Sequence, residues 1–208
     1  TTPKGHKGSR SYATATYEER LSNFLNNEIK EGENFLDIGA FIGFYTCLAA
    51  KRVGKKGHVW AFEPEEGARK ILRQNVRINN YKNVTIVGSA IGGADGTANF
   101  VASNDLGIGP AGGFVTNDSS KKNSIVSVQR LDSFFKTRPD ISIDWLKLDV
   151  DGHELQALDG MFSISKRSPK LKLILEVDPS HFSSAEHMSK LYTKLLALGF
   201  QKGFISER

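Results

Sequence analysis

The sequence has a single cysteine and no long apolar segment. Cys47 stands alone among 208 residues, which excludes an internal disulfide framework, cysteine-based zinc sites and iron–sulfur clusters. No uninterrupted apolar run approaches the roughly 20 residues that a membrane span requires, and no signal-peptide pattern opens the chain. We therefore expect a cytoplasmic protein without a membrane span.

Charge of one sign is not in large excess. Lys and Arg total 28 and Asp and Glu total 23, which gives a net charge of +5 and a pI of about 9.2. A positive field can attract nucleic acid or a membrane surface. The basic residues are interleaved with acidic ones rather than clustered, so the distribution favours ordinary solubility over a nucleic-acid partner.

The composition changes after the first residues. Residues 1–11 are small, polar and basic, which is typical of a terminal arm. No internal repeat and no second linker follows. With 39% hydrophobic and 25% charged residues, the chain has the balance of a globular protein that buries one core. We predict a flexible arm over residues 1–15 and a single domain over residues 16–208.

Strand-like and helix-like segments alternate after the arm. The apolar runs at the first, fourth and fifth expected strands are nearly continuous, as in strands that helices cover on both faces. The sequence therefore predicts an α/β fold with a doubly wound, mostly parallel sheet, which binds ligands beyond the carboxyl ends of its strands. We expect helices at 16–32, 43–53, 65–79, from 151 and at 183–199, and strands at 34–39, 58–62, 84–87, 97–101, 124–128, 143–150, 171–177 and 200–205.

Two local features add to this outline. Residues 97–101 and 124–128 look like an antiparallel pair, and the loop of about 20 residues between them is long enough to be a functional lid. Three residue pairs have the spacing of a capping box at a helix start. They are Thr16 with Glu19, Asp151 with Glu154, and Ser183 with Glu186.

The first expected strand ends in the turn D-I-G-A-F-I-G, from Asp37 to Gly43. Its two glycines, Gly39 and Gly43, allow a ligand to approach the backbone, and amides at the following helix start can donate hydrogen bonds. The dinucleotide pattern G-x-G-x-x-G is absent from this turn, which counts against a dehydrogenase. Asp37 would repel a pyrophosphate. The turn therefore favours a ligand with a cationic end, such as S-adenosylmethionine, unless it is a tight turn without a ligand.

Glu63 and Pro64 follow the second expected strand. A carboxylate there can accept hydrogen bonds from two ribose hydroxyls, although it could equally be a helix N-terminal charge beside Glu65 and Glu66. Because it comes about 25 residues after the glycine turn, the combination favours a nucleoside-type cofactor. The small residues at 88–91, after the third strand, would leave room for an adenine ring.

The fourth expected strand runs into K-L-D-V-D-G-H-E, residues 147–154. Asp149 ends a buried strand and therefore needs a polar partner. His153 can act as a general base near neutral pH, or it is a surface residue. Asp151 and Glu154 either join a site or cap the next helix.

A divalent metal is a further alternative at this edge. Glu176 and Asp178 follow the fifth strand, and together with Asp149 and His153 they could hold a cation through carboxylate oxygens. We do not favour a metal.

These motifs together resemble the FkbM family of S-adenosylmethionine-dependent methyltransferases. The resemblance implies a Rossmann-like class I methyltransferase fold and transfer of a methyl group, usually to a hydroxyl oxygen of a small molecule or sugar. Phe41 departs from the family pattern, because members often carry Asn there. The matching blocks, in family order, are F-L-D-I-G-A-F-I-G, W-A-F-E-P, R-L-D-S-F, L-K-L-D-V-D-G-H-E-L-Q-A-L-D-G and L-I-L-E-V, between Asn34 and Val177.

The resemblance also implies roles for particular residues. The first turn would line the methionine side of the cofactor, and Glu63 would hold the ribose. Ser89 and Ala90 would lie near the adenine, and Asp149 would face the methyl-transfer centre. The cofactor-binding residues that this implies are Asp37, Gly39, Ala40, Phe41, Gly43, Glu63, Pro64, Ser89, Ala90 and Asp149.

A hydroxyl is a poor nucleophile while it keeps its proton, so methyl transfer to it needs a base. His153 is the first candidate for this base and Asp149 the second, and Glu154 completes the expected catalytic group. Two other interpretations stay open. One is an RNA-directed methyltransferase, suggested by the basic pI although the N-P-P-Y tetrapeptide of amine methylators is absent. The other is a non-catalytic homologue that binds the cofactor.

Overall fold

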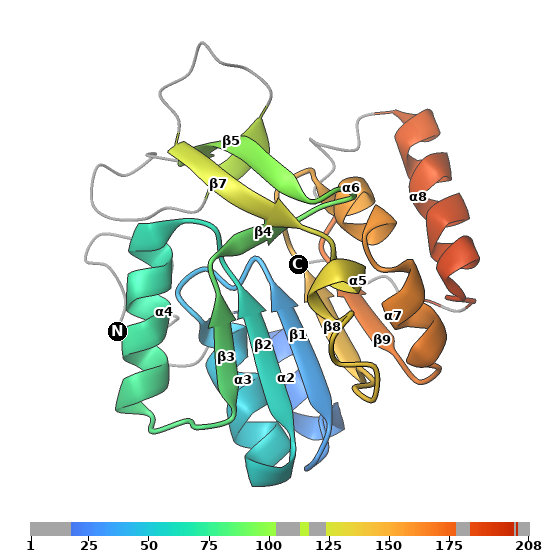
Figure 1. Cartoon of the computed structure of the whole chain (residues 1–208). Helices are drawn as coiled ribbons and strands as arrows, with labels where there is room; N and C mark the ends of the chain where they lie inside the picture. Colours follow the sequence, from blue (N-terminus) through green and yellow to red (C-terminus); the bar gives the residue numbers. More distant parts are fainter. Residues whose placement is uncertain (1–17, 103–112, 117–123, 178–183, 202, 204–208) are drawn as a thin grey trace.

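A computed structural model describes residues 18–102, 113–116, 124–177, 184–201 and 203. Within them the centre of the fold is a five-stranded sheet in the order β3-β2-β1-β8-β9, whose neighbouring strands are all parallel (Figure 1). The strand order reverses between β1 and β8, so a switch point lies at the carboxyl ends of these two strands. The doubly wound α/β prediction is confirmed. The five strands are β1 (Asn34–Ile38), β2 (His58–Phe62), β3 (Val84–Val87), β8 (Trp145–Leu148) and β9 (Lys172–Leu175).

Helices cover both faces of this sheet (Figure 1). Those of the first face are α2 (Glu19–Glu28), α3 (Phe44–Val53) with the short η1 (Gly54–Lys56), and α4 (Glu66–Ile78). Those of the second face are α5 (Leu131–Phe134), α6 (Glu154–Asp159), α7 (Phe162–Arg167) and α8 (Ala185–Leu198). Because side chains alternate along a strand, Phe35 of β1 packs against α2 and α3, whereas Leu36 packs against the second layer.

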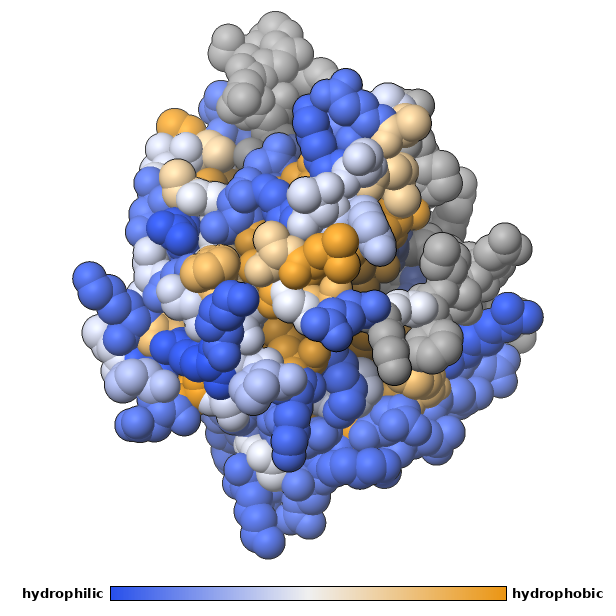
Figure 2. Space-filling model, turned by 90° about the vertical axis from the view of Figure 1, so that its right-hand side faces the viewer, coloured by the Kyte–Doolittle hydropathy of each residue, from blue (hydrophilic) through white to orange (hydrophobic). Residues whose placement is uncertain are grey.

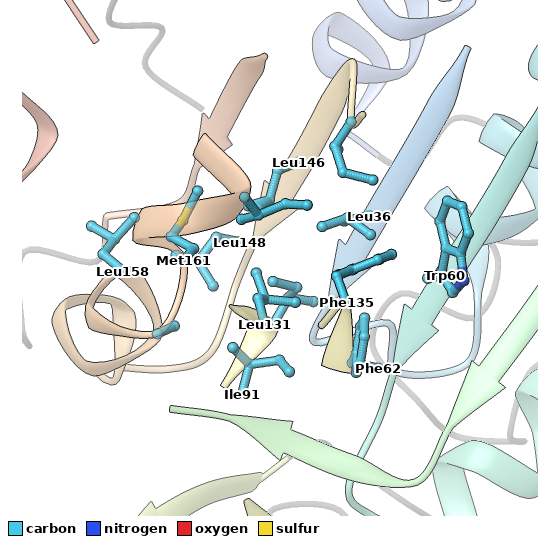
Figure 3. Close-up of a cluster of buried hydrophobic side chains, with 14 of the residues drawn as sticks. Leu36, Trp60, Phe62, Ile91, Leu131, Phe135, Leu146, Leu148, Leu158 and Met161 are labelled. Atoms are coloured by element: carbon cyan, nitrogen blue, oxygen red, sulfur yellow. The ribbon is translucent and has the colours of Figure 1, made fainter. Parts of the chain in front are cut away.

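The largest hydrophobic cluster lies between the sheet and the second helix layer. In Figure 3, side chains of the sheet such as Leu36 and Leu148 face Leu131 and Phe135. The ring of Trp60 meets that of Phe135 edge to face, with the centroids 5.3 Å apart. Burying each such side chain stabilises the fold by about 1.5–3 kcal/mol. This cluster makes the strands a rigid support for the residues at their carboxyl ends.

The outer surface of α8 remains apolar in part. Met188, Tyr192 and Leu196 follow one another at intervals of four residues and are exposed, while Leu191 and Leu198 point into the core. Figure 2 views the molecule from the side of α8 and shows hydrophobic side chains in the middle of this face, with hydrophilic ones around them. None of the helices in the described residues is long and apolar enough to cross a membrane.

A second sheet, in the order β4-β7-β5-β6, lies beyond the carboxyl ends of β1–β3 (Figure 1). The expected antiparallel pairing of 97–101 with 124–128 is confirmed, since β5 pairs with β7 in that sense. Two strands of this sheet were not expected from the sequence. β6 forms inside the long loop and pairs with β5, and β4 follows directly on β3 and pairs in parallel with β7. The four strands are β4 (Ser89–Ile91), β5 (Gly96–Ala102), β6 (Gly113–Thr116) and β7 (Ser124–Gln129).

Two of the expected capping boxes are wrong as helix starts. The N-cap of α6 is His153 rather than Asp151, because Asp151 and Gly152 adopt left-handed backbone conformations with φ of +47° and +92°. The N-cap of α8 is Ser184, whose hydroxyl accepts a hydrogen bond from the His187 amide at 3.2 Å. A shift of one to two residues at a helix start is common, because several neighbouring polar side chains can serve as the cap.

Several expectations fall outside the described residues. They include the arm over 1–15, Thr16 of the first capping box, and most of the loop between β5 and β7. The last expected strand, 200–205, is described only at three of its residues, which are not in a strand. These predictions, and the single-domain boundary at residue 16, stay predictions.

Candidate functional site

The carboxyl ends of β1, β2 and β8 bring the expected cofactor and catalytic residues to one edge of the sheet. Asp37 of β1 lies in register with Ala61 of β2 on one side and with Lys147 of β8 on the other. The turn after β1 therefore lies between Glu63, which follows β2, and Asp149, which follows β8. This edge is the switch point that the strand order defines.

Asp37 is almost completely buried, with 1% of its surface exposed. Its Oδ2 accepts a hydrogen bond from the Thr46 hydroxyl at 2.5 Å, and its Oδ1 has no hydrogen-bond partner among the described residues. Burial raises the pKa of this carboxyl above its ordinary value, and the charge of Lys147 works in the opposite direction. A buried carboxylate oxygen without a partner is costly, and it suits a cationic ligand group.

The turn from Gly39 to Gly43 needs its first glycine for two reasons. Gly39 has φ of +80°, and a Cβ there would collide with the carbonyl oxygen of Asp149. The ends of β1 and β8 therefore lie so close together that only glycine can occupy position 39. Gly43 has φ of +88°, and a Cβ there would collide with Leu72. Gly39 is therefore required by its contact with the backbone of Asp149, and Gly43 chiefly by its left-handed backbone conformation.

The amides of this turn are used within the protein. The Gly39 and Ala40 amides both donate to the carbonyl of Phe62 at 3.0 Å, and the Gly43 amide donates to that of Ala40. The expectation from the sequence concerns the amides at the start of the following helix, α3, and their donation to a ligand stays a prediction.

Phe41 links the turn to Glu63. Its amide donates to Glu63 Oε2 at 2.8 Å, and its backbone is left-handed with φ of +49°. This conformation costs a residue with a side chain roughly 1–2 kcal/mol, and Asn tolerates it better than Phe. The position where the family often has Asn is thus conformationally demanding, and the backbone hydrogen bond is one reason why the strain is tolerated.

Glu63 is 6% exposed and serves as a junction between two turns. Its second oxygen, Oε1, accepts a hydrogen bond from the Glu65 amide at 2.8 Å. Burial raises the pKa of Glu63 to about 7, although these two amides work against the increase. A carboxylate oxygen can accept more than one hydrogen bond, so each Glu63 oxygen can still accept a hydrogen bond from a hydroxyl group.

The raised pKa predicts a pH-dependent stability of the unliganded protein. The unfolded chain ionises Glu63 at the ordinary value of 4.5, whereas the folded chain holds the proton up to about 7. The contribution of Glu63 to the free energy of unfolding is therefore fully present at low pH and is lost as the pH rises from 4.5 through 7. The loss between pH 5 and 8 is about 2–3 kcal/mol. Urea unfolding should show that the wild type loses this amount relative to Glu63→Gln. Glu65→Gln, in the same turn, should retain most of the wild-type slope, and parallel pH curves for the wild type and Glu63→Gln would contradict the prediction.

Lys147 is the polar partner that Asp149 was expected to need. Lys147 is 3% exposed, and its ammonium donates to Asp149 Oδ2 at 2.7 Å and lies 5.0 Å from the centre of the Tyr45 ring. Burial lowers the pKa of Lys147, but the carboxylates of Asp149 and Asp37 outweigh burial and raise it overall. Asp149 itself keeps 31% of its side chain exposed. Lys147 was not among the residues predicted from the sequence, although a charged residue between two leucines of a buried strand was a signal.

The turn after β8 places His153 and Glu154 differently. His153 is partly buried at the start of α6. Glu154 is 3% exposed, and its Oε1 accepts a hydrogen bond from the Gly152 amide at 3.1 Å. Of the two alternatives for Glu154, this contact supports a role in holding the turn. Its part in catalysis stays a prediction.

The residues expected near an adenine belong to the second sheet. The Ser89 hydroxyl accepts a hydrogen bond from the side-chain amide of Gln129, and Ala90 packs with Phe100 and Val126. The space beside Gly88 is also used, because a Cβ there would lie 3.0 Å from the guanidinium carbon of Arg69. Small residues at this position therefore allow packing within the protein, and an adenine near them stays a prediction.

The described residues contain no group of three or more His, Cys, Asp or Glu side chains that could hold a metal ion. Of the four residues considered for a cation, Asp178 lies outside the described ranges. Asp149 forms an ion pair with the ammonium of Lys147. The side chains at this edge thus form ion pairs and turn contacts.

The arrangement of parallel strands, helix layers and acidic turns at one edge defines a class I S-adenosylmethionine-dependent methyltransferase fold. The family model described as the methyltransferase FkbM domain matches residues 37–202. The chain belongs to this family, and S-adenosylmethionine is the cofactor of the class. The family assignment made from the sequence motifs is confirmed.

Similar structures agree with this fold. A methyltransferase FkbM from Methylobacillus flagellatus KT superposes with a TM-score of 0.55 and 21% identity, over 80% of this chain and 37% of that one. A putative rRNA methylase from Clostridium thermocellum superposes with a TM-score of 0.51 and 12% identity, over 86% of this chain and 78% of that one. At these identities the likeness concerns the fold alone.

Similar sequences match over a shorter segment. The protein-L-isoaspartate O-methyltransferase of Methanosarcina mazei is 35% identical over 60 residues, which are 29% of this chain and 25% of that protein. The probable cobalt-precorrin-6B C(15)-methyltransferase of Sulfurisphaera tokodaii is 39% identical over 57 residues, 27% of this chain and 30% of that protein. The matched segments thus span only a quarter to a third of these relatives, whose names include both O- and C-methylation.

The residues present fit S-adenosylmethionine. Asp37 has a buried oxygen without a partner in the described residues, next to a turn that only a glycine permits. Glu63 is held by two amides and keeps acceptor capacity for hydroxyls. The acidic groups suit a cofactor with an ammonium, a sulfonium and a ribose, and they would disfavour a pyrophosphate.

Proposed function

We propose that this protein transfers the methyl group of S-adenosylmethionine to a hydroxyl oxygen of a small molecule or a sugar. The observation that supports this most is the position of Asp149. Its partly exposed carboxylate follows β8, its backbone lies against the Gly39 turn, and Lys147 fixes one of its oxygens. The cofactor edge and the residues expected to act on the acceptor therefore adjoin each other.

The cofactor would be held by the three turns of this edge. Asp37 and the Gly39 turn would face its methionine part, and Glu63 would accept hydrogen bonds from its ribose hydroxyls. Ser89 and Ala90 would lie on the adenine side. When bound, the cofactor supplies an electrophilic methyl group on a good leaving group, so the protein has chiefly to align the acceptor with it.

The acceptor hydroxyl needs a group that removes its proton as it reacts. We assign this role to His153, four residues after Asp149 at the start of α6. Asp149 is the second candidate, but its Oδ2 is already bound to the Lys147 ammonium. That contact suits a carboxylate that orients the acceptor or the cofactor better than one that takes up a proton.

An activity screen tests this function directly. The protein is incubated with S-adenosylmethionine carrying a labelled methyl group and with glycans, small hydroxylated metabolites or RNA. The proposal expects label in a hydroxyl compound, in an ether linkage that survives alkali. Label in RNA would support the RNA-directed alternative, which the net charge of +5 favours. Binding of S-adenosylhomocysteine without any transfer would indicate a non-catalytic homologue.

A further inference from the structure

Arg69 of α4 reaches back to the turn that carries Glu63. Its Nη1 donates to the carbonyl of Glu63 at 2.7 Å and to the carbonyl of Pro64 at 2.8 Å. Its Nη2 forms an ion pair with Glu66, in the first turn of the same helix. Only 12% of the Arg69 side chain is exposed. One guanidinium thus joins the end of β2 to the start of α4.

The guanidinium also closes the space at the end of β3. A Cβ at Gly88 would lie 3.0 Å from Arg69 Cζ and 3.1 Å from its Nε. A side chain at position 88 would therefore press on the guanidinium, which would have to shift by a few tenths of an ångström. The glycine at this position has a physical reason within the chain, which is to leave room for the guanidinium.

Glu63 is fixed from both ends by these contacts. Its carboxylate is held by the amides of Phe41 and Glu65, and its carbonyl is held by Arg69. We propose that Arg69 is a positioning residue for the cofactor ribose, because it holds the Glu63 turn in the conformation that directs the carboxylate to the ribose hydroxyls. This inference rests on the proposed cofactor site and assigns a residue that the motifs do not include.

The positive charge of Arg69 also favours the ionised form of Glu63, the residue whose turn it holds. The groups that influence Glu63 from neighbouring elements are the Glu65 carboxylate, which raises its pKa, and the Arg69 guanidinium, which lowers it. Glu66 faces Arg69 and Arg73. Removing the guanidinium should therefore raise the pKa of Glu63 further and leave it protonated at neutral pH, where it would accept fewer hydrogen bonds.

A simpler explanation is that Arg69 only stabilises α4 through Glu66. Arg73 provides a matched control for it, because Arg73 lies on the same helix and also pairs with Glu66, at 2.9 Å. None of the contacts described for Arg73 reaches the Glu63 turn. If only the Arg69 variant loses cofactor affinity, the loss is not explained by the ion pairing with Glu66, which Arg73 also makes.

The experiment measures S-adenosylhomocysteine binding by calorimetry between pH 5.5 and 8, for the wild type, Arg69→Met, Arg69→Lys and Arg73→Met. The wild type should bind more tightly as pH rises through about 7, where Glu63 ionises. Arg69→Met should bind at least about tenfold more weakly at pH 7, with its pH midpoint shifted upward, because the charge that lowers the pKa of Glu63 is lost. Arg69→Lys should keep the wild-type midpoint yet lose affinity, because an ammonium cannot reproduce the planar set of hydrogen bonds.

Arg73→Met should match the wild type in both respects. Wild-type affinity and midpoint in Arg69→Met would overturn the inference, as would equal losses in Arg69→Met and Arg73→Met. If Arg69→Met does not fold, Arg69→Lys decides, because unchanged affinity in that variant contradicts the positioning role. Absence of binding to the wild type would instead overturn the proposed cofactor site, so the two failures are distinguishable.

Discussion

Replacing His153 by alanine should lower the rate of methyl transfer by about 10²–10⁴-fold, the usual contribution of a positioned general base. Affinity for S-adenosylhomocysteine should stay within about twofold of the wild type, because His153 lies after β8 and outside the turns of Asp37 and Glu63. Single-turnover rates with the acceptor found in the screen, together with calorimetry, separate the two effects.

The matched control for this change is Asp151→Asn. Asp151 belongs to the same turn, and Asn tolerates its left-handed backbone with φ of +47°. We expect this variant to retain most of the wild-type rate. If His153→Ala stays within a few-fold of the wild type, His153 is not the base. Asp149→Asn then becomes the variant to measure.

Replacing Lys147 by methionine should destabilise the protein by about 1–3 kcal/mol, which is less than the removal of one partner of a fully buried ion pair costs, because Asp149 is partly exposed. The ammonium donates to Asp149 and also interacts electrostatically with Asp37, so its removal takes a stabilising positive charge away from the buried Asp37 carboxyl. Burial already raises the pKa of Asp37, and this change should raise it further. Urea denaturation measures the loss.

Two further variants identify the cause of that loss. Lys147→Arg retains the charge and should cost less than Lys147→Met. In Lys147→Met/Asp149→Asn both partners of the ion pair are neutral, so the double variant should cost less than the sum of the single changes. A cost below about 1 kcal/mol for Lys147→Met would show that the ion pair contributes little to the fold.

The sequence predicted the central sheet well because its physical signal is local. Nearly continuous apolar strands flanked by amphipathic helices permit few arrangements other than a parallel sheet between two helix layers. The acidic residues that follow β1, β2 and β8 then had to share one edge, since parallel strands end on the same side. Asp37, Glu63 and Asp149 are indeed brought to this edge.

Other features depend on contacts that no local pattern reveals. β6 and β4 are short, and their hydrogen bonds come from other strands, β5 for β6 and the more distant β7 for β4. The sequence therefore predicted a loop at β6 and did not predict a strand at β4. The carbonyl of Phe62, on a neighbouring strand, accepts hydrogen bonds from the Gly39 and Ala40 amides, a contact that the sequence of the turn does not reveal. The sequence pattern does not point to Arg69, because its contacts arise only when its side chain reaches back from the start of α4 to the Glu63 and Pro64 carbonyls.

The central claim is that the edge formed by β1, β2 and β8 binds S-adenosylmethionine. A crystal structure of the protein with S-adenosylhomocysteine tests it most directly. We predict one molecule per chain, with its ribose hydroxyls on the Glu63 carboxylate and its amino-acid part at Asp37 and the Gly39 turn. A molecule bound elsewhere, or none at a concentration that saturates other methyltransferases, would contradict the claim.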